Sequence, residues 1–508
     1  MPRRVETIRE SAGSADAMLR RTASTRPSAP PPRCNLRVGA RGLLLAAALG
    51  SCAHRPKGPT TDERELLRSV VVSEVELGGG GGDAAVAAAV PSEFAPARAR
   101  ALRAAARKDA AGARDLFLDR LQRDEVSAVR REAAYALGAF EDERSAQVLE
   151  QVTSDQDPTV RSEAVRALGR RGALRLESVE RLLDDVDPLV RRSVCVALAF
   201  PRAPGAGSAD LGTVLRSRIA VEEDERVRWA IVASLGAVDA ASEESRGAFT
   251  RGLEDKNFLV RAYSFWALGK GAPAGVDDAM KILDASESPA VLRSAARSAL
   301  RAWAHRGALG SDILPRVAAF PEPALSLIVQ APPEASVEMA RVDLGALLPS
   351  SLRNPRAWLR VEGRGDILLE LLSWDAPRHV AAFIERAQRG EYSGRRIRVD
   401  PDPDFRLAGC LVADTCPEGA VAEAPGPRLP LEAFPTWFGT GTVISPGEAA
   451  GGVFISRLPI PHLDGVATGW ARVALGMEVL EIIEDGDRVE SVTVVTPLGA
   501  PFPTRAGS

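Results

Sequence analysis

The stretch "DPTVRSEAVRALG" at residues 157–169 decides the fold of the middle of this 508-residue chain. Asp157 is an N-cap acceptor placed directly before Pro158, and proline is favoured at the first position of a helix. Apolar residues then recur at helical spacing from Val160 to Leu168, which gives one apolar stripe. We expect Gly169 to end this helix in the left-handed conformation that glycine permits.

The same pattern recurs along residues 125–300, and each copy contains a valine at the same helical position. The spacings between these valines are 31, 30, 37, 33 and 31 residues, which predicts a solenoid of helix pairs. Asp187, Asp224 and Asn257 are expected to cap helices in the same way as Asp157. The six valines are Val129, Val160, Val190, Val227, Val260 and Val291.

An arginine follows the valine in five of these copies. The arginines would form a ligand-binding ladder, or they would bond acids and carbonyls in the next repeat. We favour the second interpretation, because every unit of a solenoid needs contacts with its neighbours. Cys195 lies on one of the inner helices and is expected in the core. The arginines are Arg130, Arg161, Arg191, Arg228 and Arg261.

The repeated pattern D-x-x-V-R-x-x-A-x-x-A-L-G resembles HEAT repeats of the bacterial type. The resemblance implies an all-α HEAT-like solenoid over residues 96–310, with residues 96–124 as a divergent capping unit. Residues 201–210 are expected to form a surface loop within the third unit.

The N-terminal region has the composition of a targeting segment. Residues 1–51 hold nine arginines against three acids, and the apolar run Gly42–Leu49 is too short to cross a bilayer. "LGSC" at residues 49–52 resembles the bacterial lipobox. The resemblance implies a signal peptide over residues 1–51, a lipidated Cys52, and a lipid-anchored location in the bacterial cell envelope facing the periplasm. The alternatives are an ordinary secretory signal with a chance cysteine, or a buried helix.

Composition also limits the partners and the domain boundaries. After residue 51 the chain has 56 basic and 65 acidic residues, so we expect no nucleic-acid partner. Residues 52–95 contain the glycine run Gly78–Gly82 and predict a flexible tether. Residues 311–355 are rich in proline and predict a linker.

The signals change in residues 356–508. "AWLRVEGRGDILLELLS" predicts two strands joined by a turn, and "APRHVAAFIERAQRGEYSG" predicts a helix from about Pro377 to Arg389. Short strands follow in "FRLAGCLV", "GTVISP", "GVFISRL", "GWARVALG" and "VESVTVVTPL", with a short helix in "MEVLEIIED". This order predicts a closed β-barrel capped by two helices.

This region resembles cyclophilin-type peptidyl-prolyl cis-trans isomerases. The matching pieces occur in family order: "GDILLELLSWDAPRHVAAFIERAQRGEYSG", "GTVIS", "GGVFIS", "PHLDG" and "GWARVALGMEVLEIIEDGDRV". The resemblance implies a cyclophilin-like β-barrel that binds clients with X–Pro bonds and needs no cofactor. Such a site combines an apolar pocket for the proline ring, a donor near the prolyl nitrogen, and polar side chains that hold the flanking peptide.

The resemblance also implies residue roles. Arg398 in "RIRVD" corresponds to the catalytic arginine, with a solvated strand arginine as the alternative. Phe405 and Phe454 correspond to pocket phenylalanines, His462 takes the aromatic rim position, and Leu463 lines the pocket. No histidine has the spacing of a metal site or a catalytic triad.

Two polar positions of the family are replaced. Ala408 and Gly452 stand where the family has glutamines, so catalysis is expected to be weak or absent. Cys410 and Cys416 would close a small disulfide loop in an oxidising periplasm, or they would remain two free thiols. Three functions stay open: an isomerase whose solenoid binds clients, a non-catalytic protein-binding scaffold, and an assembly scaffold that uses the solenoid alone.

Overall fold

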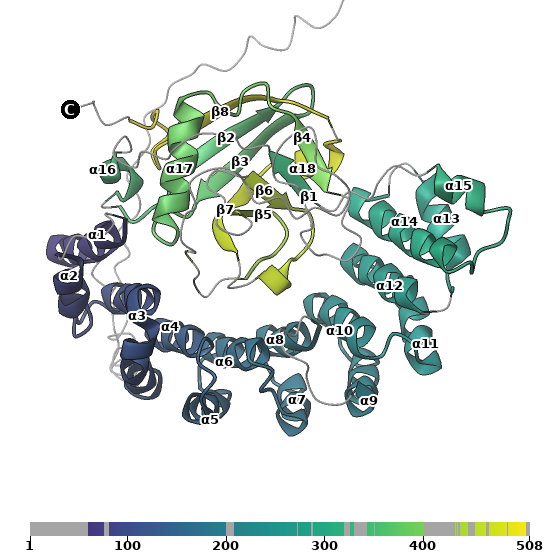
Figure 1. Ribbon diagram of the computed structural model, residues 1–508, viewed down its shortest axis with the longest axis horizontal. Coiled ribbons are helices and arrows are strands. Elements are labelled where there is room, and N and C mark those ends of the chain that lie inside the picture. Colours follow the sequence, from purple (N-terminus) through teal and green to yellow (C-terminus); the bar gives the residue numbers. More distant parts are fainter. Residues whose placement is uncertain are drawn as a thin grey trace, which may run out of the picture. The chain divides into compact units, whose positions relative to one another are not determined.

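The computed structural model describes residues 59–75, 81–199, 208–319 apart from 272, 286 and 287, 326–329, 343–349, 351–400, 432, 434, 437–445, 453–463, 467–484 and 486–503. Within these residues an array of helices precedes a curled antiparallel sheet (Figure 1). The helical solenoid predicted from the repeats is confirmed.

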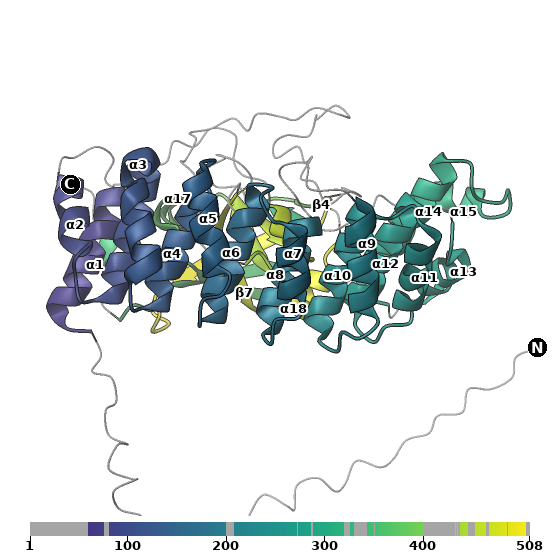
Figure 2. The ribbon, with the colours of Figure 1, turned by 90° about the horizontal axis from the view of Figure 1, so that it is seen from below.

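The solenoid consists mainly of helix pairs that follow one another along the chain (Figure 2). The first helix of each pair packs on the first helix of the next pair. The array begins with α1 (Thr61–Val75), α2 (Gly81–Ala89) and α3 (Ala95–Arg123), and the pairs are α4 (Ser127–Leu137) with α5 (Glu143–Val152), α6 (Pro158–Arg170) with α7 (Leu176–Leu183), α8 (Pro188–Ala199) with α9 (Ser208–Ile219), α10 (Glu225–Val238) with α11 (Glu243–Gly252), and α12 (Phe258–Lys270) with α13 (Val276–Asp284), followed by α14 (Ala290–His305) and α15 (Leu314–Ala318).

The predicted N-caps are confirmed. The side chains of Asp157, Asp187, Asp224 and Asn257 each accept a hydrogen bond of 2.8 Å from the backbone N–H two residues later. These bonds satisfy amide groups that a helix leaves without internal partners at its start.

The prediction that Gly169 ends its helix in the left-handed conformation is wrong, and the glycines at the equivalent positions of later repeats behave in the same way. Gly169 and Gly236 lie inside α6 and α10, and neither they nor Gly269 have positive φ. A Cβ atom at Gly169 would lie 2.5 Å from the Cβ of Ala197, and one at Gly236 would lie 2.7 Å from the Cβ of Ala267. The glycines are therefore needed for the close approach of successive helices.

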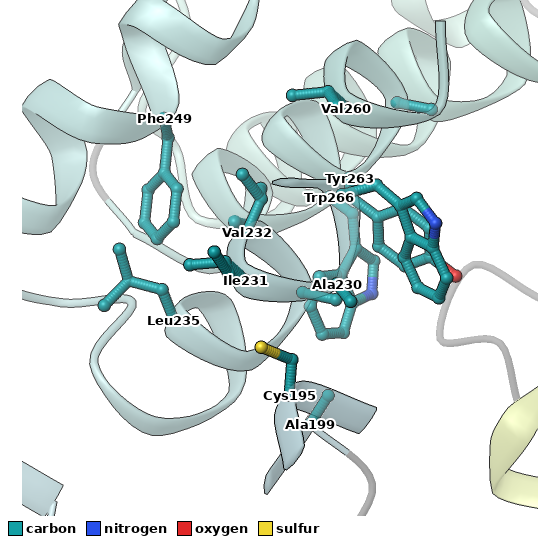
Figure 3. Close-up of a cluster of buried hydrophobic side chains, with 14 of the residues drawn as sticks. Cys195, Ala199, Ala230, Ile231, Val232, Leu235, Phe249, Val260, Tyr263 and Trp266 are labelled. Atoms are coloured by element: carbon teal, nitrogen blue, oxygen red, sulfur yellow. The ribbon is translucent and has the colours of Figure 1, made fainter. Parts of the chain in front are cut away.

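The solenoid core contains Cys195, which is fully buried as expected. Figure 3 shows its sulfur pointing from α8 toward α10, with Ile231 and Leu235 of α10 and Phe249 of α11 in the same cluster. Burial raises the pKa of the Cys195 thiol to about 12, so this side chain is an apolar core residue.

Two segments that are expected from the sequence to lack regular structure contain helices or a strand. The predicted tether contains α1 and α2, because Val70 and Ala89 pack against the alanines of α3. The predicted linker contains strand β1 (Ser326–Val329) and the short helix α16 (Leu344–Leu347). The predicted capping unit at residues 96–124 is the single long helix α3.

Within the described residues the sheet has eight antiparallel strands in the order β4-β1-β6-β5-β7-β3-β2-β8. Its edge strands are joined at one end, where Ile397 donates to the carbonyl of Asp487 at 2.6 Å and Val489 donates to that of Arg395 at 2.9 Å. The remaining strands are β2 (Arg356–Val361), β3 (Gly365–Leu371), β4 (Ile397–Asp400), β5 (Thr442–Ser445), β6 (Val453–Ser456), β7 (Thr468–Leu475) and β8 (Val489–Val495).

Helices α17 (Pro377–Gln388) and α18 (Met477–Ile482) lie where the sequence predicts helices. α17 packs against β7 and β8, and α18 packs against β3. Phe383 of α17 lies 4.8 Å from the ring of Trp470 and 5.4 Å from that of Tyr392, which forms an aromatic centre for the core.

Candidate functional site

A second, smaller apolar cluster lies beside the main core of the sheet. The alternation of strand side chains explains it, because Val453 and Ile455 of β6 belong to the main core while Phe454 points to the opposite face. Ile444 of β5 is the register partner of Phe454 and joins the same cluster. We call this group the β5–β6 cluster; it consists of Phe438, Ile444, Phe454, Ile460 and Ala467, with Leu463 packed against it.

The structure brings together two of the residues predicted for a pocket, Phe454 and Leu463. His462 lies between Pro461 and Leu463 in a short 3-10 turn, so its backbone is at the edge of the cluster. Phe438, Ile444 and Ile460 were not predicted. The alternation in "GTVIS" could have indicated Ile444, whereas the other two lie in irregular segments.

Arg398 lies on β4 and is separated from β6 by one strand. Ile328 of β1 pairs with Arg398 on one side and with Phe454 on the other. The three residues therefore occupy one row across the sheet, and two strand spacings correspond to about 10 Å.

The other predicted site residues lie outside the described residues. These are Cys52, Phe405, Ala408, Cys410, Cys416 and Gly452. Their proposed roles stay predictions.

A buried arginine holds the end of strand β6 beside the cluster. Arg457, directly after β6, is 4% exposed and donates from Nη2 to the carbonyl of Ile483 at 2.7 Å. Burial lowers the pKa of Arg457 to about 10. This contact ties the end of β6 to the segment that follows α18.

A buried histidine–carboxylate pair holds the start of α17. Nδ1 of His379 lies 2.7 Å from Oε2 of Glu432, and Glu432 also accepts from the backbone N–H groups of Arg378 and His379. Burial by itself raises the pKa of Glu432, but the bond from His379 and nearby positive charge lower it below its usual value. No group of three or more potential metal ligands occurs among the residues that the structure describes.

Four of the repeated arginines form ion pairs within the solenoid. Arg130 forms two bonds to Asp155, of 2.8 and 2.9 Å, and donates from Nη1 to the carbonyl of Asp124. The interpretation as bonds between repeats is therefore confirmed for four arginines. The equivalent pairs are Arg161 with Asp185, Arg191 with Glu222, and Arg228 with Asp255.

A hollow of the solenoid lies away from the β5–β6 cluster. It has a volume of about 710 Å³ and is lined by residues of α5 and α7, among them Glu143, Glu150 and Glu177. Of the described pocket residues, neither Phe454 nor Leu463 lines it. In the described part of the chain, no helix is long and apolar enough to cross a membrane.

Comparison with known proteins gives two kinds of match. A family model for HEAT repeats matches residues 83–169 and 150–235. A peptidyl-prolyl cis-trans isomerase of Helicobacter pylori is 33% identical over 144 residues, which are 27% of this chain and 84% of that protein. Peptidyl-prolyl cis-trans isomerase B of Bacillus subtilis is 30% identical over 141 residues, 26% of this chain and 94% of that protein.

Solved structures include a cyclophilin-type peptidyl-prolyl cis-trans isomerase of Cryptosporidium parvum. It is 14% identical, has a TM-score of 0.21, and the match covers 28% of this chain and 98% of that one. On the sequence relationship to the Helicobacter pylori and Bacillus subtilis proteins, together with the repeat match, this chain belongs to the peptidyl-prolyl cis-trans isomerase family and carries HEAT repeats in the same polypeptide.

Proposed function

We propose that this protein binds X–Pro segments of client proteins and accelerates their cis–trans isomerisation weakly. The observation that carries the proposal is the 33% identity to an isomerase over 84% of that protein's length. The β5–β6 cluster is the apolar surface that would receive the proline ring, and it contains Phe454 and Leu463. The solenoid would bind other parts of the client.

The proposed chemistry lowers a barrier of about 18–20 kcal/mol that comes from amide resonance. A donor near the prolyl nitrogen weakens this resonance. Arg398 is the candidate donor, and its place in the same row as Phe454 supports the choice. The rest of the site would exclude water and hold the peptide in a fixed orientation.

The expected activity is weak because two amide side chains of the family pattern are replaced by Ala408 and Gly452. Loss of one positioning hydrogen bond costs about 1–3 kcal/mol, which is tenfold to a hundredfold in rate. The same replacements favour the alternative function, a non-catalytic protein-binding scaffold. We propose neither a cofactor nor a nucleic-acid partner.

A prolyl-isomerisation assay on the full chain tests the proposal. We expect the wild type to accelerate exchange of an Ala-Pro peptide, and Arg398→Ala to remove most of the acceleration. Arg360→Ala is the matched control, because Arg360 is an exposed strand arginine on β2. No acceleration by the folded wild type would favour the scaffold; acceleration unchanged in Arg398→Ala would assign the donor to another residue.

We further propose that Cys52 carries a lipid that anchors the protein in the bacterial envelope, facing the periplasm. The support is the "LGSC" motif after a short apolar run. Mass spectrometry of the N-terminal peptide should show the acylated Cys52, and Cys52→Ser should release the protein from the membrane fraction. Mass spectrometry of the peptide that contains Cys410 and Cys416, digested without reduction, would show whether the two form the proposed disulfide.

A further inference from the structure

The β5–β6 cluster is closed in this structure. Phe438, Ile444, Phe454, Ile460 and Ala467 are all at most 7% exposed. A proline ring can reach Phe454 only if one of the segments over it moves. The two irregular segments that supply Phe438 and Ile460 are joined to each other, since the N–H of Ile460 donates to the carbonyl of Phe438 at 2.8 Å.

The first of these segments is attached to the solenoid through Trp437, the residue before Phe438. The guanidinium carbon of Arg192 lies 4.2 Å from the centre of the Trp437 ring, and the ring of Trp229 lies 6.2 Å from it. Arg192 and Trp229 each come directly after one of the repeated arginines, so they occupy the same position in successive repeats. Helices α8 and α10 therefore present one continuous face to Trp437.

The second segment is attached through Leu458 and Pro459, the residues before Ile460. Leu458 is 1% exposed and is part of the hydrophobic core of the solenoid. The hydroxyl of Tyr263 on α12 donates to the carbonyl of Pro459 at 3.3 Å. In Figure 3 the hydroxyl oxygen of Tyr263 points away from Phe249.

We propose that helices α8, α10 and α12 hold the β5–β6 cluster closed by binding the chain's own segments at Trp437 and Leu458–Pro459. Release of this contact would open the pocket for X–Pro peptides. This inference rests on the proposed function. A pocket that is open in only a fraction of molecules has its apparent affinity reduced by that fraction, so the solenoid would control how tightly a peptide binds.

The variant Trp437→Ala tests the inference, and Trp358→Ala is the matched control because Trp358 is a partly exposed tryptophan on β2. Two quantities are measured on the full chain: hydrogen exchange of the Ile460 amide, and the Kd of a fluorescent peptide that contains Ala-Pro. We expect Trp437→Ala to speed exchange at Ile460 and to strengthen peptide binding roughly tenfold, while the control changes neither.

The outcomes distinguish the proposed coupling between solenoid and pocket from the proposed binding of X–Pro peptides. Unchanged exchange at Ile460 in a folded Trp437→Ala protein would overturn the coupling between solenoid and pocket. Faster exchange with an unchanged Kd would show that the contact does not control the pocket. Faster exchange with no peptide binding in any variant would refute the proposed X–Pro function and leave the coupling in place. Tyr263→Phe removes the bond to Pro459 and should change both quantities in the same direction by a smaller amount.

Discussion

At the residue scale, four of the repeated arginines stabilise the solenoid because each pairs with an acid whose side chain is at most 15% exposed. The side chain of Glu222 is 1% exposed and receives two bonds from Arg191. Glu222 also accepts bonds from Arg218 and from the backbone N–H of Asp224. We expect Arg191→Ala to reduce the free energy of unfolding by about 1–2 kcal/mol, since the buried carboxylate loses two charged bonds and keeps these others.

The control for this prediction is Arg226→Ala. Arg226 pairs with Asp224, but its side chain is 62% exposed. An exposed pair contributes at most about 1 kcal/mol, so urea unfolding should show a much smaller loss for this variant. Equal losses in the two variants would contradict the argument that burial of the acid sets the cost.

The same pairs make stability depend on pH. Burial by itself raises the pKa of Glu222 and Asp185, but the bonds from Arg191 and Arg218 to Glu222, and from Arg161 to Asp185, outweigh it and lower both pKa values. The unfolded chain then takes up protons at higher pH than the folded chain, so this stability is present above the usual carboxyl pKa and is lost as pH falls. Melting temperature should drop steeply below pH 4.5, and Glu222→Gln should flatten the drop.

Sequence reasoning succeeded at this scale where the partner is nearby in the chain or the position repeats. The caps at Asp157 and Asn257 act within two residues, and the arginine position recurs in five of the six copies. The role of Gly169 could not be predicted from its own helix, because the atom that excludes a side chain there belongs to Ala197 of the next repeat.

At the scale of elements, the short strand β1 is paired on both sides and joins β4 to the rest of the sheet. Its four residues lie between β4 and β6, so both edges of the strand are paired. Ile328→Pro should destabilise the sheet by about 3 kcal/mol or more, because proline has no N–H to donate and its ring clashes in a central strand. Ile328→Val keeps the donor and the strand preference and should be nearly neutral in thermal unfolding. A mild effect of the proline would mean that the strand is dispensable.

This strand could not be predicted from the sequence. A run as short as "SLIV" in a proline-rich segment carries no periodicity, and its partners β4 and β6 lie about 70 and 130 residues further along the chain. By contrast, β2, β3 and α17 have long alternating or helical patterns and were placed correctly. Local patterns identify elements, whereas the order of strands in a sheet depends on distant pairing.

At the scale of the whole molecule, helix α3 connects the solenoid to the sheet. Arg103 is buried between Glu132 of α4 and Asp375, which lies between β3 and α17, and its Nη1 is 2.6 Å from the Asp375 carboxylate. Arg100 donates to the carbonyl of Trp374 at 2.6 Å. Three arginines of α3, counting Arg107, therefore bind one short segment of the C-terminal half.

If this connection makes the solenoid and the sheet unfold together, breaking it should let them unfold at different temperatures. We expect one thermal transition for the wild type, with helical circular dichroism and tryptophan fluorescence changing together. Asp375→Ala leaves the Arg103 guanidinium without one of its two carboxylates. Because tryptophans lie in both halves, the fluorescence change should then show two steps, only one of which coincides with the loss of helical signal. Asp366→Ala is the matched control, since Asp366 pairs with the exposed Arg360 on the sheet alone and should leave the transitions coincident. Coincident transitions in Asp375→Ala would show that other contacts, such as those of Trp437 and Leu458 with the solenoid, are sufficient to couple the halves.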